Sequence, residues 1–276
     1  MPLRIVHVSD LHTGSRDELQ VEPALRALVD EIRPELVIAS GDLTHRGRSE
    51  EHVRAAAFLS GLGPPVFAVP GNHDIPYTFP ARFTRPWAAF ERCWETTEPV
   101  FASDGLHVVG LNSVRPWRHQ SGELRAPALE RAAARLGEAR QGAFRVAVLH
   151  HQLIGAPWRT RKRPVARRNV VLASLVDAGA ELIVSGHIHQ ATAAARHEFE
   201  LWEGDEQGAA VAVAPGLGQP RPHRRGEARG LLVYDVSERE LRVRTYVWRG
   251  DEWGIAAERL FPRSPPARPP ESPLAS

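Results

Sequence analysis

Five short apolar runs in this chain end directly in side chains that can bind a metal ion or move a proton. Asp10, Asp42 and Asn72 follow the first three runs, and they are 32 and 30 residues apart. That spacing is the length of a strand–helix–strand unit. Three successive parallel strands would bring these side chains to the carboxyl edge of one sheet, where open α/β folds bind ligands. The spacing therefore predicts an α/β fold with a site at this edge.

Two further runs extend the pattern in the second half of the chain. Residues 146–149 precede His150, and residues 182–184 precede His187 and His189, again about one strand–helix unit later. Helical spacing of apolar residues predicts helices over residues 21–32, 49–59, 127–137 and 169–177, with Ser49 as the cap of the second. A further strand is expected over residues 106–111.

From residue 191 onward the pattern is that of β-structure. Alternating runs predict strands over residues 199–202, 209–214, 231–236 and 241–248. The short turns between them indicate an antiparallel meander. Residues 263–276 are rich in proline and lack apolar periodicity, so we expect a disordered tail there.

The amino-acid composition narrows the types of fold, cellular location and binding partner that are possible for the chain. A net charge of +2 gives no argument for nucleic acid. Cys93 is the only cysteine, which excludes a disulfide framework and a thiolate metal cage within the chain. No apolar run approaches the ~20 residues needed to cross a bilayer, and the first residues lack a signal-like segment. We therefore expect a cytoplasmic protein with no membrane partner. The sequence does not indicate an oligomeric state.

The side chains at the strand ends form one chemical set. They are Asp10, His12, Asp42, Asn72, His73, His150, His187 and His189. Oxygen and imidazole ligands without sulfur argue against a structural zinc cage and suit manganese, iron or zinc in a catalytic role. The set exceeds the needs of one ion, which predicts two metals roughly 3.5–4 Å apart that share a carboxylate.

The residues of these motifs and their order along the chain resemble the motifs of a known superfamily. Asp10-x-His12, Gly41-Asp42, Gly71-Asn72-His73-Asp74, His150 and Gly186-His187-x-His189 resemble the calcineurin-like metallophosphoesterases. Within that superfamily, VSDLH, GDLT and VPGNHDIP are similar to the bacterial class III 3',5'-cyclic-nucleotide phosphodiesterases. The motifs span residues 5–189. The fold that this implies is an α/β four-layer sandwich, two mixed β-sheets flanked by helices, as a single domain over residues 1–262.

The resemblance also implies a role for each motif residue. One metal would be bound by Asp10, His12, Asp42 and His189, and the other by Asp42, Asn72, His150 and His187. Asp42 would bridge the two ions, and His73 would protonate the leaving oxygen. The implied reaction is hydrolysis of a small phosphodiester, such as a cyclic nucleotide, by metal-activated hydroxide.

Two alternatives remain open from the sequence. Gln152, which DNA-repair nucleases of the superfamily also carry, and the basic run RTRKRPVARR at residues 159–168 favour a nuclease. The near-neutral net charge argues against the long basic groove that a nuclease needs. A scaffold without catalysis is disfavoured because every ligand and His73 are present.

For several other residues we expect a structural or peripheral role, or leave the role open. His7 is expected to be a hydrogen-bonded core residue, and His151 a residue of the pocket. The aromatic residues 76–98 are expected to be partly helical and to cover the mouth of the site. His45, Arg46 and Arg115 can face either substrate or solvent.

Overall fold

The computed structural model describes residues 3–15, 21–118, 120–157, 160, 162–198, 209–218, 227 and 229–263. Its helices are α1 (Glu22–Ile32), α2 (Ser49–Ser60), α3 (Ala81–Thr84), α4 (Ala88–Trp94), α5 (Ala126–Gly137), α6 (Arg168–Asp177) and the short 3-10 helix η1 (Arg196–Glu198). No helix in these ranges has the length and apolar character needed to cross a membrane. The strand expected over residues 199–202 and the tail from residue 264 lie outside the described residues.

The first sheet carries the N-terminal strand–helix units. Its six strands are β1 (Leu3–Val8), β2 (Leu36–Ala39), β3 (Val66–Ala68), β10 (Gly230–Val236), β11 (Glu240–Trp248) and β12 (Trp253–Pro262), in the order β12-β11-β10-β1-β2-β3. Strands β1, β2 and β3 are parallel, as their spacing predicts. Strand β10 pairs antiparallel with β1, and β11 and β12 continue the antiparallel part.

The second sheet is mixed in the same way. Its strands are β4 (Val100–Ala102), β5 (Leu106–Gly110), β6 (Phe144–Val148), β7 (Leu182–Ser185), β8 (Thr192–Ala195) and β9 (Ala210–Val213), in the order β4-β5-β6-β7-β9-β8. Strands β5, β6, β7 and β9 are parallel, and β4 and β8 form antiparallel edges. The parallel strands β6 and β7 therefore end at the same edge, where His150 and His187 follow them.

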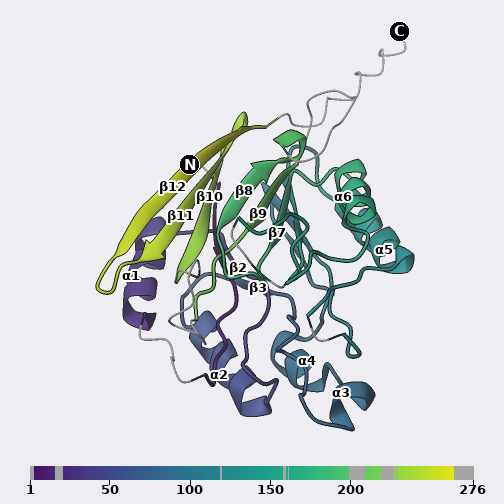
Figure 1. Ribbon diagram of the computed structural model, residues 1–276. Helices are drawn as coiled ribbons and strands as arrows, with labels where there is room; N and C mark the ends of the chain where they lie inside the picture. Colours follow the sequence, from purple (N-terminus) through teal and green to yellow (C-terminus); the bar gives the residue numbers. More distant parts are fainter. Residues whose placement is uncertain are drawn as a thin grey trace.

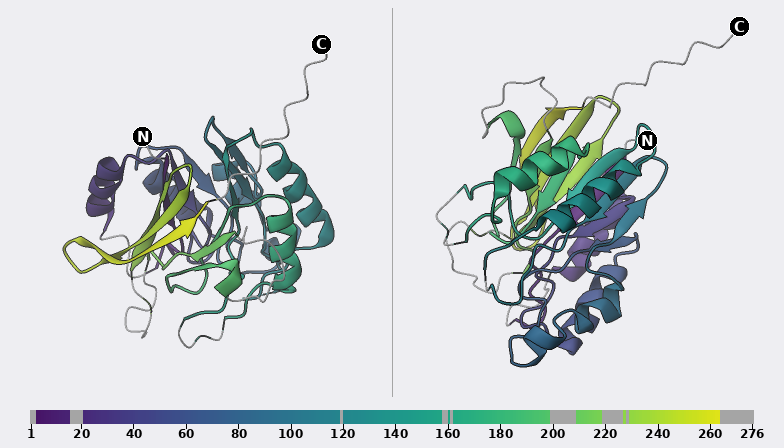
Figure 2. Two further views of the ribbon diagram at one scale, coloured as in Figure 1. Left: turned by 90° about the horizontal axis from the view of Figure 1, so that it is seen from above. Right: turned by 90° about the vertical axis from the view of Figure 1, so that its right-hand side faces the viewer.

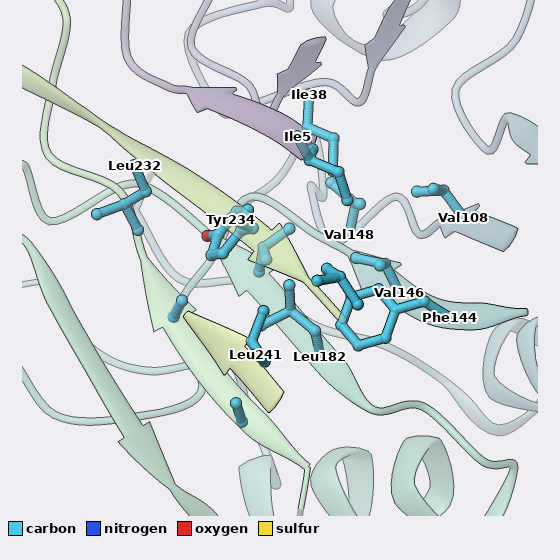
Figure 3. Packing of buried hydrophobic residues seen from close by; sticks show 14 of the residues in the cluster. Ile5, Ile38, Val108, Phe144, Val146, Val148, Leu182, Leu232, Tyr234 and Leu241 are labelled. Atoms are coloured by element: carbon cyan, nitrogen blue, oxygen red, sulfur yellow. The ribbon is translucent and has the colours of Figure 1, made fainter. Parts of the chain in front are cut away.

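The two sheets pack face to face over a shared apolar core (Figure 3). Ile5 and Ile38 of the first sheet lie in one buried cluster with Val108, Val146 and Leu182 of the second. These alternate residues of the strands point inward, because successive side chains of a strand face opposite sides. Burying apolar side chains from both sheets provides the main driving force for joining them.

Helices cover the outer faces of both sheets. Leu25 of α1 and Phe58 of α2 belong to a buried cluster with strands β1 and β2. Helices α5 and α6 contribute Leu129 and Leu172 to a third cluster with strands β6 and β7. Figure 1 and Figure 2 show α1 on one side of the paired sheets and α5 and α6 on the other. The predicted four-layer sandwich of two mixed β-sheets flanked by helices is confirmed.

Two expectations about local structure are wrong. The antiparallel meander is correct for strands β10 and β11, and strand β12, which was not predicted, extends it. Ala210–Val213, however, lies in the other sheet, parallel to β7. Alternation reveals a strand without specifying its partner. Ser49 is the first residue of α2 rather than its cap. Oε2 of Glu51 instead accepts the backbone N–H groups of Arg46 (2.7 Å) and Arg48 (3.3 Å).

The chain stays anchored slightly beyond the last strand. Arg263, the first residue of the predicted tail, donates through Nε to Oε2 of Glu181 at 2.7 Å. Its guanidinium also lies 5.1 Å from the ring centroid of Phe144. Arg263 therefore attaches the end of strand β12 to the second sheet.

Candidate metal centre

The loops that follow the parallel strands of the two sheets contact one another closely. The backbone N–H of His187, beyond β7, donates to Oδ2 of Asp10, beyond β1, at 2.9 Å. A Cβ atom on Gly186 would lie 1.8 Å from Oγ of Ser9, and one on Gly71 would lie 2.2 Å from the backbone N of Asp42. Only glycine permits these approaches. The two sheets thus bring their strand ends to one site.

Most of the predicted ligands have an unusual backbone conformation. Positive φ values occur at Asp10 (53°), His12 (49°), Asp42 (52°), His187 (73°) and His189 (57°). These are five of the eight described non-glycine residues with positive φ. Such residues are uncommon and cluster at functional sites, where the surrounding structure holds the strain. The backbone is shaped here to aim particular side chains.

The first group of predicted ligands consists of Asp10, His12 and His189, all buried. Nε2 of His189 lies 3.0 Å from Oδ1 of Asp10 and 3.2 Å from Nε2 of His12. Nε2 of His12 is 3.9 Å from the same oxygen of Asp10. The three ligand atoms converge on one point from two sheets.

The second group contains His150 and His187, whose rings face each other. Nδ1 of His150 donates to the carbonyl of Ser40 at 2.8 Å, and Nε2 of His187 donates to the carbonyl of Gln120 at 3.1 Å. When neutral, each ring therefore presents a lone pair on its other nitrogen. These nitrogens are 3.1 Å apart, so their lone pairs would repel unless one ring carried a proton or both rings bound a metal ion.

The carboxylates around this pair favour positive charge. Burial opposes a proton on His150, but the charges of Asp42 and Asp10 outweigh it and raise the pKa of His150 to about 9. Burial lowers the pKa of His187 well below its usual range, and the positive charge of Lys162 adds to that effect. The second group is therefore suited to a metal ion that takes the place of the proton.

Asp42 lies between the two groups. Its Oδ1 is 3.4 Å from Nε2 of His150, and its Oδ2 is 4.0 Å from Nε2 of His12. The backbone N–H of His73 donates to Oδ1 at 2.8 Å, which fixes the plane of the carboxylate. Each oxygen of Asp42 therefore faces a different group.

Three buried oxygens at the site have no hydrogen-bond partner among the described residues. They are Oδ1 of Asp10, Oδ2 of Asp42 and Oδ1 of Asn72. Buried polar atoms are normally paired, and an unpaired carboxylate oxygen is costly. Divalent cations would satisfy all three, so the residues present fit a metal centre. A further trio, His12, His45 and His73, also has its ligand nitrogens within 4.8 Å of one another.

Comparison with known proteins agrees with this chemistry. The model of the family described as calcineurin-like phosphoesterase matches residues 3–191. The chain belongs to this family. Its members are metallophosphoesterases, and the fold therefore implies divalent metal ions at the aspartate and histidine clusters of this phosphoesterase.

Curated relatives include proteins named as phosphodiesterases. A probable cyclic nucleotide phosphodiesterase of Synechococcus sp. is 32% identical over 213 residues, covering 69% of this chain and 75% of the relative. One of Rhodococcus erythropolis is 26% identical and covers 69% of this chain and 66% of the relative. A glycerophosphodiester phosphodiesterase of Enterobacter lignolyticus is 32% identical over 80 residues, 25% of this chain and 29% of that protein.

Solved structures share the fold of this phosphoesterase. A purple acid phosphatase from yellow lupin matches with a TM-score of 0.72 at 12% identity, over 100% of this chain and 57% of the lupin chain. A dimetal phosphatase from Danio rerio matches with a TM-score of 0.63 at 13% identity, over 96% of this chain and 100% of that chain.

Two residues that orient the histidines of the phosphoesterase were missed from the sequence. The carbonyl of Gln120 accepts from His187, and Oε2 of Glu227 lies 3.6 Å from Nδ1 of His189. Partners of this kind fix which nitrogen of a histidine faces a metal. Neither residue lies near a motif, and a backbone carbonyl carries no side-chain signal, so no local pattern identifies them.

His73 lies beside the two groups of predicted metal ligands, and its ring is held in place. Nδ1 donates to the carbonyl of His45 at 2.8 Å, and the hydroxyl of Tyr77 is 2.8 Å from the same nitrogen. The rings of His73 and His12 are 4.7 Å apart. Tyr77 belongs to the aromatic segment expected at the mouth of the site, and its hydroxyl contacts His73, whereas Phe90 of the same segment is buried in the cluster with α2.

The remaining polar residues separate into buried and peripheral sets. His7 is buried and contacts the hydroxyls of Tyr234 and Ser40 at 2.8 Å, as expected of a core residue. His151 is buried, and the centre of its ring lies 4.6 Å from that of His187.

Arg115 donates to the carbonyls of Asn112 and Val114, so its guanidinium is committed to its own loop.

Gln152 and the basic run bear on the nuclease alternative. Gln152 is fully buried, so its amide does not present itself to a long nucleic-acid substrate. Arg163, Arg167 and Arg168 of the run are exposed. Lys162 differs from them, because its ammonium donates to the backbone carbonyl of His187.

Proposed function

We propose that this phosphoesterase is a dinuclear metal-dependent phosphodiesterase whose substrate is a small diester such as a cyclic nucleotide. The observation that carries the proposal is the position of Asp42. Its two oxygens face His12 on one side and His150 on the other. A carboxylate in this position suits two cations that share one ligand. The metal ligands proposed are Asp10, His12, Asp42, Asn72, His150, His187 and His189.

The relatives support the substrate class. Two of them are named probable cyclic nucleotide phosphodiesterases, and a third, over a shorter stretch, is named for a glycerophosphodiester. All three names describe phosphodiesters rather than monoesters. We extend that class to this chain.

The proposed reaction divides the work between the cations and the protein. Divalent cations, when bound, would supply the Lewis acidity that makes water a nucleophile near neutral pH and would offset the charge of the diester. The buried carboxylates of Asp10 and Asp42 hold positive charge at the centre. Asn72 adds a neutral oxygen, which keeps the ligand set from becoming more negative.

His73 is proposed as the proton donor to the leaving oxygen. Its Nδ1–H is committed to the carbonyl of His45, so its Nε2 is the nitrogen left for a substrate. An alkoxide is a poor leaving group, and the imidazolium form of His73, which carries a second proton on Nε2, can transfer that proton to it in the transition state and become neutral. The contact from Tyr77 limits rotation of the ring.

A hydrolysis panel tests this proposal. Purified protein loaded with manganese would be assayed on 3',5'-cyclic nucleotides, glycerophosphodiesters, monoesters and single-stranded DNA, before and after chelation. We expect hydrolysis of small diesters that stops on chelation and returns when manganese is restored. Turnover only on monoesters, preferential cleavage of DNA, or full activity after exhaustive chelation would each contradict the proposal.

A further inference from the structure

Lys162 is the only lysine in the chain, and it lies at the candidate metal centre. Its Nζ donates to the backbone carbonyl of His187, one of the proposed ligands. The side chain is half-buried rather than extended into solvent. Every other fixed cation in the chain is an arginine, so this ammonium is chemically distinct.

The segment that carries Lys162 is anchored to the site. Val165 is buried in the apolar cluster under α5 and α6. Its backbone N–H donates to the carbonyl of Gln152 at 3.0 Å, and that of Ala166 donates to Gly122 at 2.9 Å. The first contact attaches the segment to the loop that carries His150, and the second attaches it to the loop before α5. The position of the ammonium therefore follows from the packing of the fold.

The charge of Lys162 has no acidic partner of its own. No carboxylate among the described residues lies within ion-pair distance of its ammonium, and a carbonyl satisfies one of its three donors. Its positive charge nevertheless acts on the predicted metal ligands. Burial raises the pKa of Asp10, but His189, His150 and then the charge of Lys162 lower it, and their combined effect is the larger.

A lysine is unfavourable beside two divalent cations unless an anion enters the same space. Like charges repel, and a half-buried ammonium is stabilised by an anionic partner. A phosphodiester carries one negative charge and gains another as water attacks. An ammonium is a common point-charge ligand for phosphate oxygens.

We propose that Lys162 binds the non-bridging phosphoryl oxygens of the substrate, next to the cation held by His187. This inference rests on the proposed phosphodiesterase function. It makes Lys162 the residue of the basic run that acts on the substrate, whereas the exposed arginines of the run remain in solvent. The competing explanation is that Lys162 only tethers the loop of His187 through its hydrogen bond.

Two substitutions separate these explanations. Lys162→Gln removes the charge but retains an N–H donor for the carbonyl of His187, whereas Lys162→Met removes both. Arg163→Gln removes an exposed charge from the neighbouring position and is the matched control. Each variant would be loaded with manganese and measured for metal content, KM for a cyclic nucleotide, and competitive inhibition by inorganic phosphate.

We expect Lys162→Gln and Lys162→Met to raise KM and the inhibition constant of phosphate by about tenfold or more, the range of one charge-assisted contact. Metal content should be unchanged, and Arg163→Gln should change either constant by less than twofold. If Lys162→Gln matches the wild type while Lys162→Met loses metal or stability, the tether explanation holds and the proposal is wrong.

Selective acylation of amines gives a readout that needs no turnover. An amine-acylating reagent modifies Lys162 and the α-amino group, and mass spectrometry distinguishes them. Inorganic phosphate should slow acylation of Lys162 in the manganese-loaded protein and leave the α-amino group unaffected. Protection without any diester hydrolysis would support the anion site and contradict the proposed function. Hydrolysis of diesters without protection, and with normal KM in Lys162→Gln, would overturn the role of Lys162.

Discussion

Nε2 of His150 and Nδ1 of His187 lie 3.1 Å apart, although the other nitrogen of each ring already donates to a backbone carbonyl. Two neutral rings held in this way would direct lone pairs at each other. The fold thus imposes an arrangement that needs either a proton on one ring or a metal ion bound by both, and it does so with histidines that follow strands β6 and β7. The carboxylate of Asp42 beside them supplies the compensating charge.

Metal binding should release a proton from this pair. With no metal ion bound, the raised pKa of about 9 keeps His150 protonated at neutral pH, and a divalent cation must displace that proton. Between pH 7 and 8 we expect the affinity of chelator-treated protein for manganese to rise by about tenfold per pH unit. Calorimetry in buffers of different ionisation enthalpy should detect the released proton. Affinity independent of pH, with no buffer dependence, would contradict this assignment.

Asp42→Ala should cost more than loss of any other single ligand. Asp42 is the carboxylate between the two groups, so its removal opens both. Loss of a residue that merely orients a ligand typically costs 10–100-fold, and we expect Asp42→Ala to exceed ~100-fold in kcat/KM with loss of both ions. Asn72→Ala is the comparison, because Asn72 would contact one ion. Near-normal turnover and metal content in Asp42→Ala would show that Asp42 is not shared.

His73→Ala should reveal a dependence on the leaving group. The substitution keeps the backbone N–H that holds Asp42, so both metals should remain. Loss of a general acid is worth ~10²–10⁴-fold on a cyclic nucleotide, and much less on a bis-nitrophenyl phosphate, whose nitrophenolate leaves unaided. Equal losses on the two substrates at full metal content would indicate that His73 orients the phosphate instead.

Gly186→Ala should disrupt the contact between the two sheets at the site. Its Cβ would lie 1.8 Å from Oγ of Ser9 and 2.6 Å from Oδ2 of Asp10. We expect a loss of about 1–3 kcal/mol in the free energy of unfolding, together with weaker metal binding. Gly137→Ala is the matched control, because a Cβ there meets nothing within 4 Å. Similar stability and metal affinity in the two variants would contradict the packing argument.

His7 should make the folded protein sensitive to acid. Burial lowers the pKa of His7 to about 3, below the value of about 6.5 for an unfolded chain. The unfolded state therefore binds the proton first, and stability falls as pH drops from 6.5 towards 3. From pH 6.5 to 4.5 the free energy of unfolding falls by about 2.3 kcal/mol, somewhat less than two full steps of 1.36 kcal/mol, because the unfolded histidine is already half protonated at pH 6.5.

The measurement is denaturant unfolding of the wild type and two variants at both pH values. The stability gap between wild type and His7→Gln should narrow on acidification by about that amount. The gap for Val6→Ala, a neighbour in strand β1 without an ionisable group, should stay constant. Parallel behaviour of the two variants would show that His7 does not titrate as described.

The sequence predicted the strand ends well because one signal carried two kinds of information. An apolar run that stops at an aspartate or histidine marks both a strand and its carboxyl edge, as at Asp10 and His187. The sequence predicted the pairing of the strands less well than their ends. Ala210–Val213 reads as a strand from its apolar residues, but its parallel partner β7 depends on a tertiary contact. Strand β12, mostly exposed at a sheet edge, has little apolar alternation to reveal it.

The supporting contacts of the site could not be predicted for a different reason. Gln120 acts through its backbone carbonyl, so its identity is not informative. Lys162 appeared as one charge in a basic run, and only the fold places its ammonium against His187. The left-handed backbone at the aspartates and histidines is likewise imposed by the junction of the two sheets, since neither residue type requires it.

Anomalous diffraction from crystals of the manganese-loaded protein tests the central claim most directly. The account predicts two anomalous peaks roughly 3.5–4 Å apart, with Asp42 contacting both. One should lie with Asp10, His12 and His189, and the other with Asn72, His150 and His187. A single peak, or a peak held by His45 and His73 in place of either site, would contradict a dinuclear centre bridged by Asp42.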